Sequence, residues 1–495
     1  MSRGKRISLA MFAVALLFAI SALQRPIDKL RPQFTAEAIF RPETVSPGKT
    51  GETSPLFDMS LQFFGAAAMG MREAVASMLW VRTDELFHTG NYEAILPLVR
   101  LVTWLDPHQI DVYSTGAWHL DYNFTDKDQR SDRRYIPPAI ALMEEGINNN
   151  REIYDLYFDL AWTHYLQKVK DPRAAALWME KAVAKRGMDP NTGRTIPRPA
   201  FVDRMLAHTY EKAGMFDKAE KQWLKCLAGS ETAAKENPKD ATPWLDVDIC
   251  KRNLGLMLLR LAWRYGDMGA YERGIKVLDS LGSPDPNQKR ALEAAKKSFA
   301  EFKARGTAPH DTQPPVDAKF QVTWKKVAPK VLVLEGKLAL VPAEDYKGLA
   351  SEPYTLWYEQ NQQQPEISRR KWQDGCRLRI LLADYNYDYR NLQRLNRFDW
   401  DVDKNQTIMM DDVMARRGEF KIKIDMSQDP SMYPFTKDRY RLVVWFNPQE
   451  APEFIQDRIG WKGEGLTDKN CLDTKTIPGC RMIRKEFILR KSDII

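Results

Sequence analysis

Two hydrophobic periods divide this chain into a helical part and a strand-forming part. Between about residues 57 and 305, apolar residues recur at spacings of three and four, which predicts amphipathic helices. Beyond Lys319 the period becomes two: from Phe420 to Met426 every second residue is apolar, and charged residues stand between them. Such alternation predicts strands with one buried face. The Pro-rich stretch 306–318 lies between the two patterns and is expected to be a linker.

The helical pattern is itself repeated. Its clearest copy spans residues 203–227, where Gly214 supplies a permissive backbone at the turn between two short helices. Large and small apolar residues alternate on these helices, at Leu206, Ala207, Tyr210, Phe216, Ala219, Trp223, Cys226 and Leu227. Looser copies occupy residues 80–107, 110–147, 154–183 and 250–281. The region 57–305 is therefore expected to be a stack of helical hairpins.

This pattern resembles the tetratricopeptide repeat (TPR), a helical hairpin with a period of about 34 residues. The resemblance implies an all-α solenoid that binds other proteins in a groove, because packing residues and not a catalytic site define the family. The chain also resembles bacterial membrane-anchored TPR proteins of uncharacterised function, through the turn at residues 105–107 and the segment 118–123. This second resemblance concerns topology and implies no activity.

The N-terminus carries a short basic segment followed by an uncharged one. A basic cluster within residues 1–6 precedes residues 7–23, which fall slightly short of the about 20 apolar residues that cross a bilayer. We expect a cytoplasmic tail at 1–6, an uncleaved transmembrane anchor at 7–23 and a tether at 24–56, with the bulk of the chain extracytoplasmic. Two alternatives stay open, namely a cleaved signal peptide and a buried helix of a soluble protein.

Residues 319–495 carry several separate strand patterns. Besides the alternating segment described above, these lie at residues 331–340, 377–383, 440–446 and 486–490, with Pro, Asn, Asp and Gly between them. Several strands that each have one wet face predict an all-β, sandwich-like domain.

A partner-binding surface is expected on the first helices of the hairpins. Aromatic and charged residues fall on one side of three of these helices and suit the capture of an extended peptide or a partner helix. They are Trp80, Asp84 and Phe87, then Phe158, Trp162 and Tyr165, then Arg204, His208 and Glu211. The alternative is that some of these aromatic residues are core between neighbouring repeats.

Two sets of residues suggest metal ions. His119, His164 and His208 recur on successive first helices, but stacked helices lie about 10 Å apart, which is too far for a shared tetrahedral ion. In the β domain, alternating oxygen ligands would suit a calcium site, but Lys404 and Met410 stand where a calcium loop of the hand type needs Gly and Glu, and both runs are also ordinary for solvated turns. This candidate site comprises Asp384, Asn386, Asp388, Asp399, Asp401 and Asp403. No other cofactor is expected.

The five cysteines of the chain allow one short bridge. Cys471 and Cys480 bracket a segment with a Pro-Gly turn, and a disulfide between them would contribute about 2–3 kcal/mol on the chain-entropy model. Cys226, Cys250 and Cys376 stand in apolar patterns and are expected in the core.

Charge and motifs exclude several functions. The formal net charge of +8 is mild for 495 residues, and no basic block with interleaved aromatics predicts nucleic-acid binding. No catalytic motif and no small-molecule site is found, so we expect no enzyme. The favoured function is an anchored scaffold of the bacterial cell envelope that binds proteins through the helical groove, with the β domain as a second contact surface. The alternative is a glycan- or polymer-binding protein that uses Trp357, Trp372, Trp400 and Trp461.

Overall fold

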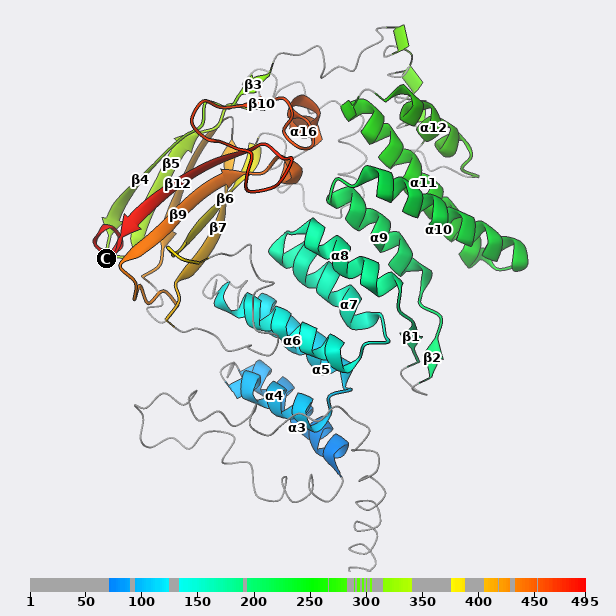
Figure 1. The fold of residues 1–495 in the computed structure, drawn as a ribbon, viewed down its shortest axis with the longest axis horizontal. Coiled ribbons are helices and arrows are strands. Elements are labelled where there is room, and N and C mark those ends of the chain that lie inside the picture. Colours follow the sequence, from blue (N-terminus) through cyan, green and yellow to red (C-terminus); the bar gives the residue numbers. More distant parts are fainter. Residues whose placement is uncertain are drawn as a thin grey trace, which may run out of the picture.

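The described part of the chain begins with helices and ends with strands, as the computed structural model shows (Figure 1). The structure describes residues 71–89, 94–123, 133–189, 194–265, 267–282, 315–340, 375–387, 405–416, 418–427, 432–451 and 453–495, with isolated helical residues between 289 and 304.

The described helices pair into five hairpins stacked in chain order (Figure 1). Their first helices are α3 (Arg72–Thr89), α5 (Ile110–Trp118), α7 (Asp155–Asp159), α9 (Ala200–Lys212) and α11 (Ala241–Tyr265). Their second helices are α4 (Ile95–Leu105), α6 (Ile136–Asn149), α8 (Pro172–Val183), α10 (Phe216–Glu236) and α12 (Met268–Asp279). A small hairpin of β1 (Gly187–Met188) and β2 (Thr195–Ile196) lies between the third and fourth. One core cluster of buried apolar side chains runs through all five hairpins, so that neighbouring hairpins bury each other's apolar faces.

Close helix approach depends on small residues. A Cβ atom on Gly146 of α6 would lie 2.5 Å from the ring of Tyr113 on α5, so that ring packs where only glycine leaves room. At the turn between α9 and α10, Gly214 has a φ of +68°, a backbone conformation that glycine adopts without strain.

Two first helices continue as π-helices. The segment η4 (His119–Asn123) prolongs α5, and η6 (Leu160–Val169) prolongs α7. A π-helix carries more residues per turn than an α-helix and is frequent at functional sites. The two π-helical segments belong to neighbouring hairpins and contact each other. The hydroxyl of Tyr122 in η4 donates to the carbonyl oxygen of Thr163 in η6 at 2.7 Å.

The described strands of the second part form one antiparallel eight-stranded sheet in the order β11-β12-β9-β6-β7-β8-β5-β4. These strands are β4 (Gln321–Ala328), β5 (Val331–Lys337), β6 (Gly375–Asp384), β7 (Ile408–Arg416), β8 (Glu419–Asp425), β9 (Arg439–Phe446), β11 (Leu472–Asp473) and β12 (Met482–Arg490). A short parallel pair joins β3 (Val316–Asp317) to β10 (Leu466–Thr467). The helical segments are η5 (Arg133–Tyr135), η11 (Pro448–Glu450), α16 (Glu453–Ile459) and α17 (Lys491–Ile494).

The sheet folds over on itself at the β7–β8 turn. In the described residues only the pair Arg416 and Glu419 joins these two strands. Side chains from both sides of that turn share one core cluster, among them Leu332 and Leu334 of β5, Phe420 of β8, and Leu378 and Leu442 of β6 and β9. The two halves therefore face each other across a common core.

The central strands are buried on both faces, which differs from the expected single wet face. Leu381, Val443 and Trp445 point away from the common core and form a second buried cluster with Met482. Because both faces are covered, β6 and β9 contain nearly continuous apolar runs and not the alternation seen in β8.

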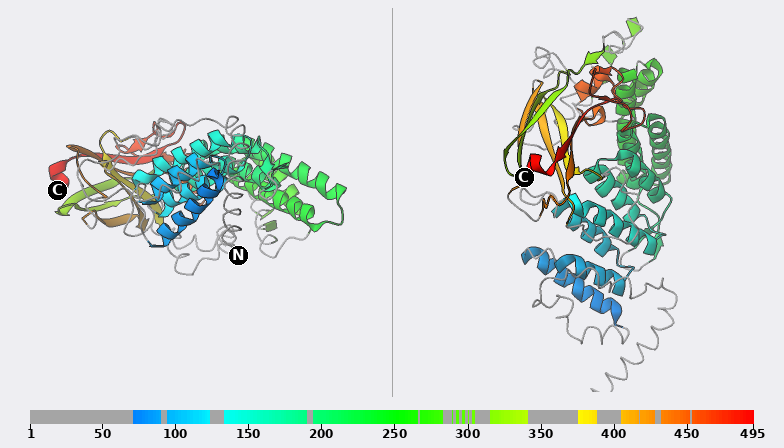
Figure 2. Two further views of the ribbon diagram at one scale, coloured as in Figure 1. Left: turned by 90° about the horizontal axis from the view of Figure 1, so that it is seen from below. Right: turned by 60° about the vertical axis from the view of Figure 1, so that its left-hand side comes forward.

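The β domain lies against the turns that connect first to second helices (Figure 2). Arg173 at the start of α8 donates to the carbonyl oxygen of Pro478 at 3.2 Å, across 305 positions of sequence. Further along the stack, the ring of Phe216 on α10 meets the indole of Trp461 at 6.0 Å. A Cβ atom on Gly214 would lie 2.2 Å from Nε1 of that indole, so the glycine also makes room for Trp461.

The expectation of a single-pass membrane protein is corrected. Among the residues that the structure describes, none forms a helix both long and apolar enough to span a bilayer. The segment 7–23, on which the expected signal anchor rested, lies outside the described residues, as do the tail 1–6 and the tether 24–56. We therefore withdraw the transmembrane element and the extracytoplasmic placement and describe the fold as helical followed by strand-rich.

Candidate functional site

The surface formed by the first helices of the hairpins, which we call the first-helix face, contains most of the predicted partner-binding residues. On α3, Trp80 and Phe87 are half-buried against the core, and Phe87 packs on the ring of His119 at 4.3 Å. Asp84 is exposed and lies 3.6 Å from His88 on its own helix. The first hairpin thus presents one exposed acid and two aromatic residues that also support the fold.

The third hairpin presents an aromatic cluster. Phe158 and Trp162 stack with ring centroids 6.5 Å apart, and Phe201 of α9 meets Phe158 edge-on at 5.5 Å. Phe158 and Trp162 are half-buried, while Phe201 is 39% exposed. Tyr165 is only 2% exposed, so it belongs to the core and not to the binding surface. Phe158, Trp162 and Phe201, which we call the aromatic cluster, span two neighbouring hairpins.

Two predicted partner-binding residues of α9 already have partners within the protein. Arg204 forms an ion pair with Asp246 of α11 at 2.8 Å. Glu211 is buried and accepts hydrogen bonds from Nε1 of Trp223 at 2.7 Å and from Arg260 at 2.8 Å. Both side chains therefore hold α9 to its neighbours, a role that the spacing along α9 could not reveal.

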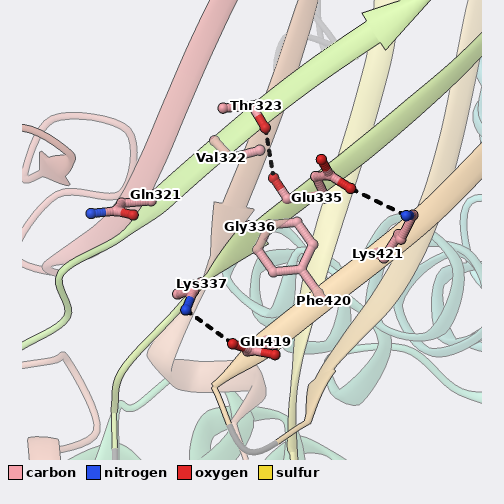
Figure 3. Close-up of a pocket in the computed structure, with 9 residues that line it drawn as sticks. All are labelled: Gln321, Val322, Thr323, Glu335, Gly336, Lys337, Glu419, Phe420 and Lys421. Atoms are coloured by element: carbon pink, nitrogen blue, oxygen red, sulfur yellow. Dashed lines mark hydrogen bonds and ion pairs between the residues drawn. The ribbon is translucent and has the colours of Figure 1, made fainter.

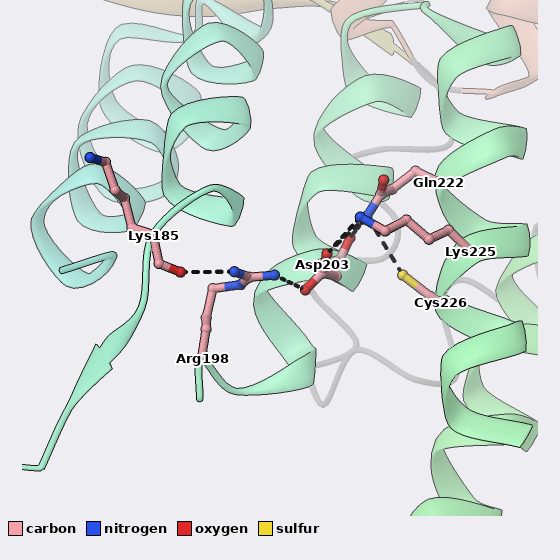
Figure 4. Close-up of polar contacts among 6 residues, drawn as sticks. All are labelled: Lys185, Arg198, Asp203, Gln222, Lys225 and Cys226. Atoms are coloured by element: carbon pink, nitrogen blue, oxygen red, sulfur yellow. Dashed lines mark hydrogen bonds and ion pairs between the residues drawn. The ribbon is translucent and has the colours of Figure 1, made fainter. Parts of the chain in front are cut away.

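A further polar network fixes the start of α9 (Figure 4). Asp203 stands in the first turn of that helix and pairs with Arg198, which also donates to the carbonyl oxygen of Lys185 at 2.9 Å. Gln222 of α10 donates to the carbonyl oxygen of Asp203 at 3.2 Å. A carboxylate in the first helical turn also interacts favourably with the helix dipole. The network therefore fixes the position of α9, and with it Phe201, relative to the third hairpin.

His208 remains on the face and gives the fold a defined pH response. Burial lowers the pKa of His208 below its ordinary value of 6.5; Glu211 opposes this shift, while Arg260 and Arg204 reinforce it. A histidine with a lowered pKa in the folded state contributes stability above pH 6.5, and this contribution is lost as the pH falls from 6.5 toward the lowered pKa. We expect His208→Gln to lose less stability than the wild type between about pH 7.5 and 5.5, as measured by thermal melts. Equal losses in both proteins would contradict this assignment.

A pocket of about 230 Å³ lies between the second and third hairpins, next to the aromatic cluster. It is lined by Ser114, Thr115, Trp118, Asp159, Thr163 and His164. Ser114 donates from its hydroxyl to Oδ2 of Asp159 at 2.6 Å, and burial raises the pKa of Asp159 although this hydrogen bond and His164 lower it. No sequence motif joins Ser114 to Asp159, because the two residues lie 45 positions apart on different hairpins.

His164, which lines the pocket, belongs to a buried histidine–aspartate pair. Nδ1 of His164 lies 2.6 Å from Oδ2 of Asp121, and the two side chains are 1% and 0% exposed. Asp121 is in η4 and His164 in η6, so the pair joins the two π-helical segments. The segment 118–123, which carries part of the resemblance to membrane-anchored TPR proteins, contains Asp121, but nothing in it indicates the partner.

Comparison with known proteins gives no family. No family model matches the chain, and no curated protein matches it. Among solved structures, one described as "Crystal structure of MamA protein" aligns with 12% identity over 42% of this chain and 93% of that one, with a TM-score of 0.24. A likeness this weak supports no conclusion about fold or function.

The three histidines of the first helices each have different neighbours. Asn123 contacts the ring of His119 at 2.6 Å, Asp121 pairs with His164, and Trp223 meets His208 edge-on at 4.8 Å. In the described residues, no group of three or more metal-ligating side chains lies together. A site shared by these histidines therefore has no geometric support.

The predicted calcium residues are only partly described. Asp384 is 7% exposed, and its Oδ1 accepts from the backbone amide of Thr407 at 3.3 Å. Asn386 lies in the turn that follows β6. The remaining four lie outside the described residues, namely Asp388, Asp399, Asp401 and Asp403. Calcium binding stays a prediction.

The cysteine bridge is not formed in the structure. Cys471 and Cys480 are both free thiols. Cys471 packs in the common core of the sheet and Cys480 in the cluster on its opposite face. The sheet therefore separates the two side chains, which the short sequence interval did not indicate.

The tryptophans proposed as a glycan platform do not form one in the described residues. Trp461 is 6% exposed and buried against the turn at Gly214. Trp357, Trp372 and Trp400 lie outside the described residues.

A larger hollow of about 470 Å³ lies over β4, β5 and β8 (Figure 3). Gly336 leaves space beside Phe420, since a Cβ atom at this position would lie 2.7 Å from the ring of Phe420. The charges at its rim are paired with each other, Lys337 with Glu419 at 3.0 Å and Lys421 with Glu335 at 3.3 Å. These cross-strand pairs stabilise the sheet and leave the hollow without convergent polar groups.

Proposed function

We propose that this protein is a helical-repeat adaptor that binds segments of partner proteins on its first-helix face, without a catalytic step and without a cofactor. The observation that carries the proposal is the aromatic cluster. Phe158, Trp162 and Phe201 come from consecutive hairpins and stay partly exposed beside a polar pocket. Rigid aromatic side chains give large contact area at low entropic cost, and such residues dominate the binding energy of protein interfaces.

The pocket beside this cluster adds orientation to the apolar contact. Trp118, at 42% exposure, forms its rim and stacks on Tyr122 with ring centroids 6.2 Å apart. An extended segment that crosses from α9 to α5 meets apolar rings first and then hydroxyl and carboxylate groups. Binding sites that combine an apolar surface with a few convergent polar groups are typical of specific recognition.

The experiment compares two tryptophans of one hairpin. Trp162 lies on the first helix, and Trp178 is also half-buried but lies on the second helix, where Lys181 contacts its ring at 3.7 Å. Peptides are selected from a random display library on the wild-type protein, and their affinities are then measured for Trp162→Ala and Trp178→Ala. We expect Trp162→Ala to weaken binding about tenfold or more, because truncation of an interface aromatic commonly costs above 1 kcal/mol. Trp178→Ala is expected to leave binding unchanged.

Thermal melts of both variants separate binding from stability. If Trp162 serves mainly the core, its loss should lower the melting temperature well below that of Trp178→Ala and affect all peptides through unfolding. Retention of all selected peptides by folded Trp162→Ala would overturn the proposed use of this face.

A further inference from the structure

We propose that the pocket between α5 and η6 receives the ammonium or guanidinium group of a basic side chain in the bound segment. This inference rests on the proposed binding function and adds the chemistry of the residue that is recognised. It is carried by the pocket lining of Ser114, Thr115, Trp118, Asp159, Thr163 and His164, which presents hydrogen-bond acceptors and an aromatic face.

The first acceptor is the carboxylate of Asp159. Its Oδ2 accepts from the hydroxyl of Ser114, and among the described residues no lysine or arginine forms an ion pair with it. Asp155, one helical turn earlier, also has no ion pair in this part of the chain. Burial raises the pKa of Asp155, and the nearby carboxylate of Asp159 raises it further. A cation bound in the pocket would offset the free-energy cost of burying the carboxylate of Asp159. It would also weaken the repulsion between the carboxylates of Asp159 and Asp155.

The second acceptor is the imidazole of His164. The side chain is 1% exposed yet lines the pocket, and the carboxylate of Asp121 holds it through Nδ1. In the tautomer whose Nδ1–H donates to this carboxylate, the second ring nitrogen, Nε2, is a hydrogen-bond acceptor. No described residue makes a hydrogen bond to Nε2, which leaves it available to a donor that enters the pocket.

The third element is the aromatic rim. Trp118 is 42% exposed and is held by its stacking on Tyr122. The face of an indole ring attracts an ammonium or guanidinium group within about 6 Å. Lys168, the one lysine of η6, contacts the ring of Tyr122 at 4.7 Å and does not line the pocket.

The three elements together fit a ligand group with several donors and no acceptor. Lysine carries three such donors and arginine five, and both lack acceptors. A carboxylate or phosphate group of a ligand has no donor to offer to Asp159 or to Nε2 of His164, so an acidic ligand is disfavoured. A volume of about 230 Å³ holds the end of one long side chain.

The test uses peptides selected from the same display library and one isosteric pair of proteins. Asp159→Asn keeps the shape of the pocket and an acceptor for Ser114 but removes the charge. Asp217→Asn removes the same charge from an exposed position of α10, a second helix that lies outside the first-helix face. Each selected peptide is also synthesised with norleucine in place of lysine or citrulline in place of arginine.

We expect selected peptides to share one basic residue. Its neutral replacement should weaken binding to the wild type at least tenfold, and Asp159→Asn should weaken the basic peptide to a similar extent. Asp159→Asn combined with the neutral peptide should show little further loss, because the two changes remove the same interaction. Asp217→Asn should leave all affinities unchanged.

Three outcomes distinguish the ideas. Peptides that depend on Trp162 but tolerate the neutral replacement would overturn this inference and leave the proposed function standing. Peptides that depend on neither Trp162 nor Asp159 would overturn both. If Asp159→Asn does not fold, the neutral replacement measured on the wild-type protein alone still decides the question.

Discussion

Replacement of Trp223 by alanine is expected to destabilise the helical part by about 3–5 kcal/mol, a cost typical of deleting a buried aromatic side chain. Trp223 is 0% exposed in the core of the fourth hairpin, and its indole donates to Glu211. The change leaves a cavity and removes one of the two donors of a buried carboxylate, which adds to the cost. The measurement is the helical circular-dichroism signal against urea.

Leu224 gives a matched control for this change. It is the next residue on the same helix, and it is 48% exposed. Leu224→Ala should change the unfolding free energy by less than about 0.5 kcal/mol. A Trp223→Ala protein with the midpoint of Leu224→Ala would mean that the fourth hairpin contributes little to the stability of the stack.

The second large effect concerns the buried pair of Asp121 and His164. Asp121→Ala leaves His164 without its carboxylate in a site that is 1% exposed, and leaving one partner of a buried hydrogen-bonded pair unsatisfied commonly costs about 1–3 kcal/mol. The double variant Asp121→Ala with His164→Phe removes both polar groups. We expect the double variant to be more stable than Asp121→Ala alone, because no buried polar group is then left without its partner.

Thermal melts of the wild type, the two single variants and the double variant form a complete cycle. Simple additivity of the two single changes would show that the two side chains do not interact. The pair would then be a coincidence of packing, and the hydrogen bond from Tyr122 to Thr163 would be the polar contact left to connect the two π-helical segments in the described residues.

The hairpins could be predicted from the sequence because local patterns specify them. Gly214, the apolar spacing around it and Trp223 all lie within one repeat, and the structure has a helix–turn–helix there. The strand at residues 420–426 could be predicted for the same reason, since a period of two needs only neighbouring residues. Strands buried on both faces carry no such alternation, so the second buried face of β6 and β9 was missed.

The candidate site could be predicted only in part. The aromatic residues Phe158 and Trp162 were found because they share one face of one helix. The pocket was not found, because its contacts join different hairpins, as between Ser114 and Asp159. The π-helical segments also change which residues share a face, and a pattern based on 3.6 residues per turn cannot follow that change. Arg204 was misinterpreted for a related reason, since Asp246 lies in another helix.

The contacts between the β domain and the helical turns have a consequence for the order in which this protein folds during synthesis. Each hairpin can form as soon as its own two helices have emerged, since its contacts are local. The turn at Gly214 and the ring of Phe216 must wait about 245 more residues for Trp461. Until then an apolar surface that the finished protein covers stays open to water, to chaperones and to other nascent chains. Ribosome-stalled chains that end before the last strands should therefore be more prone to aggregate than the completed protein.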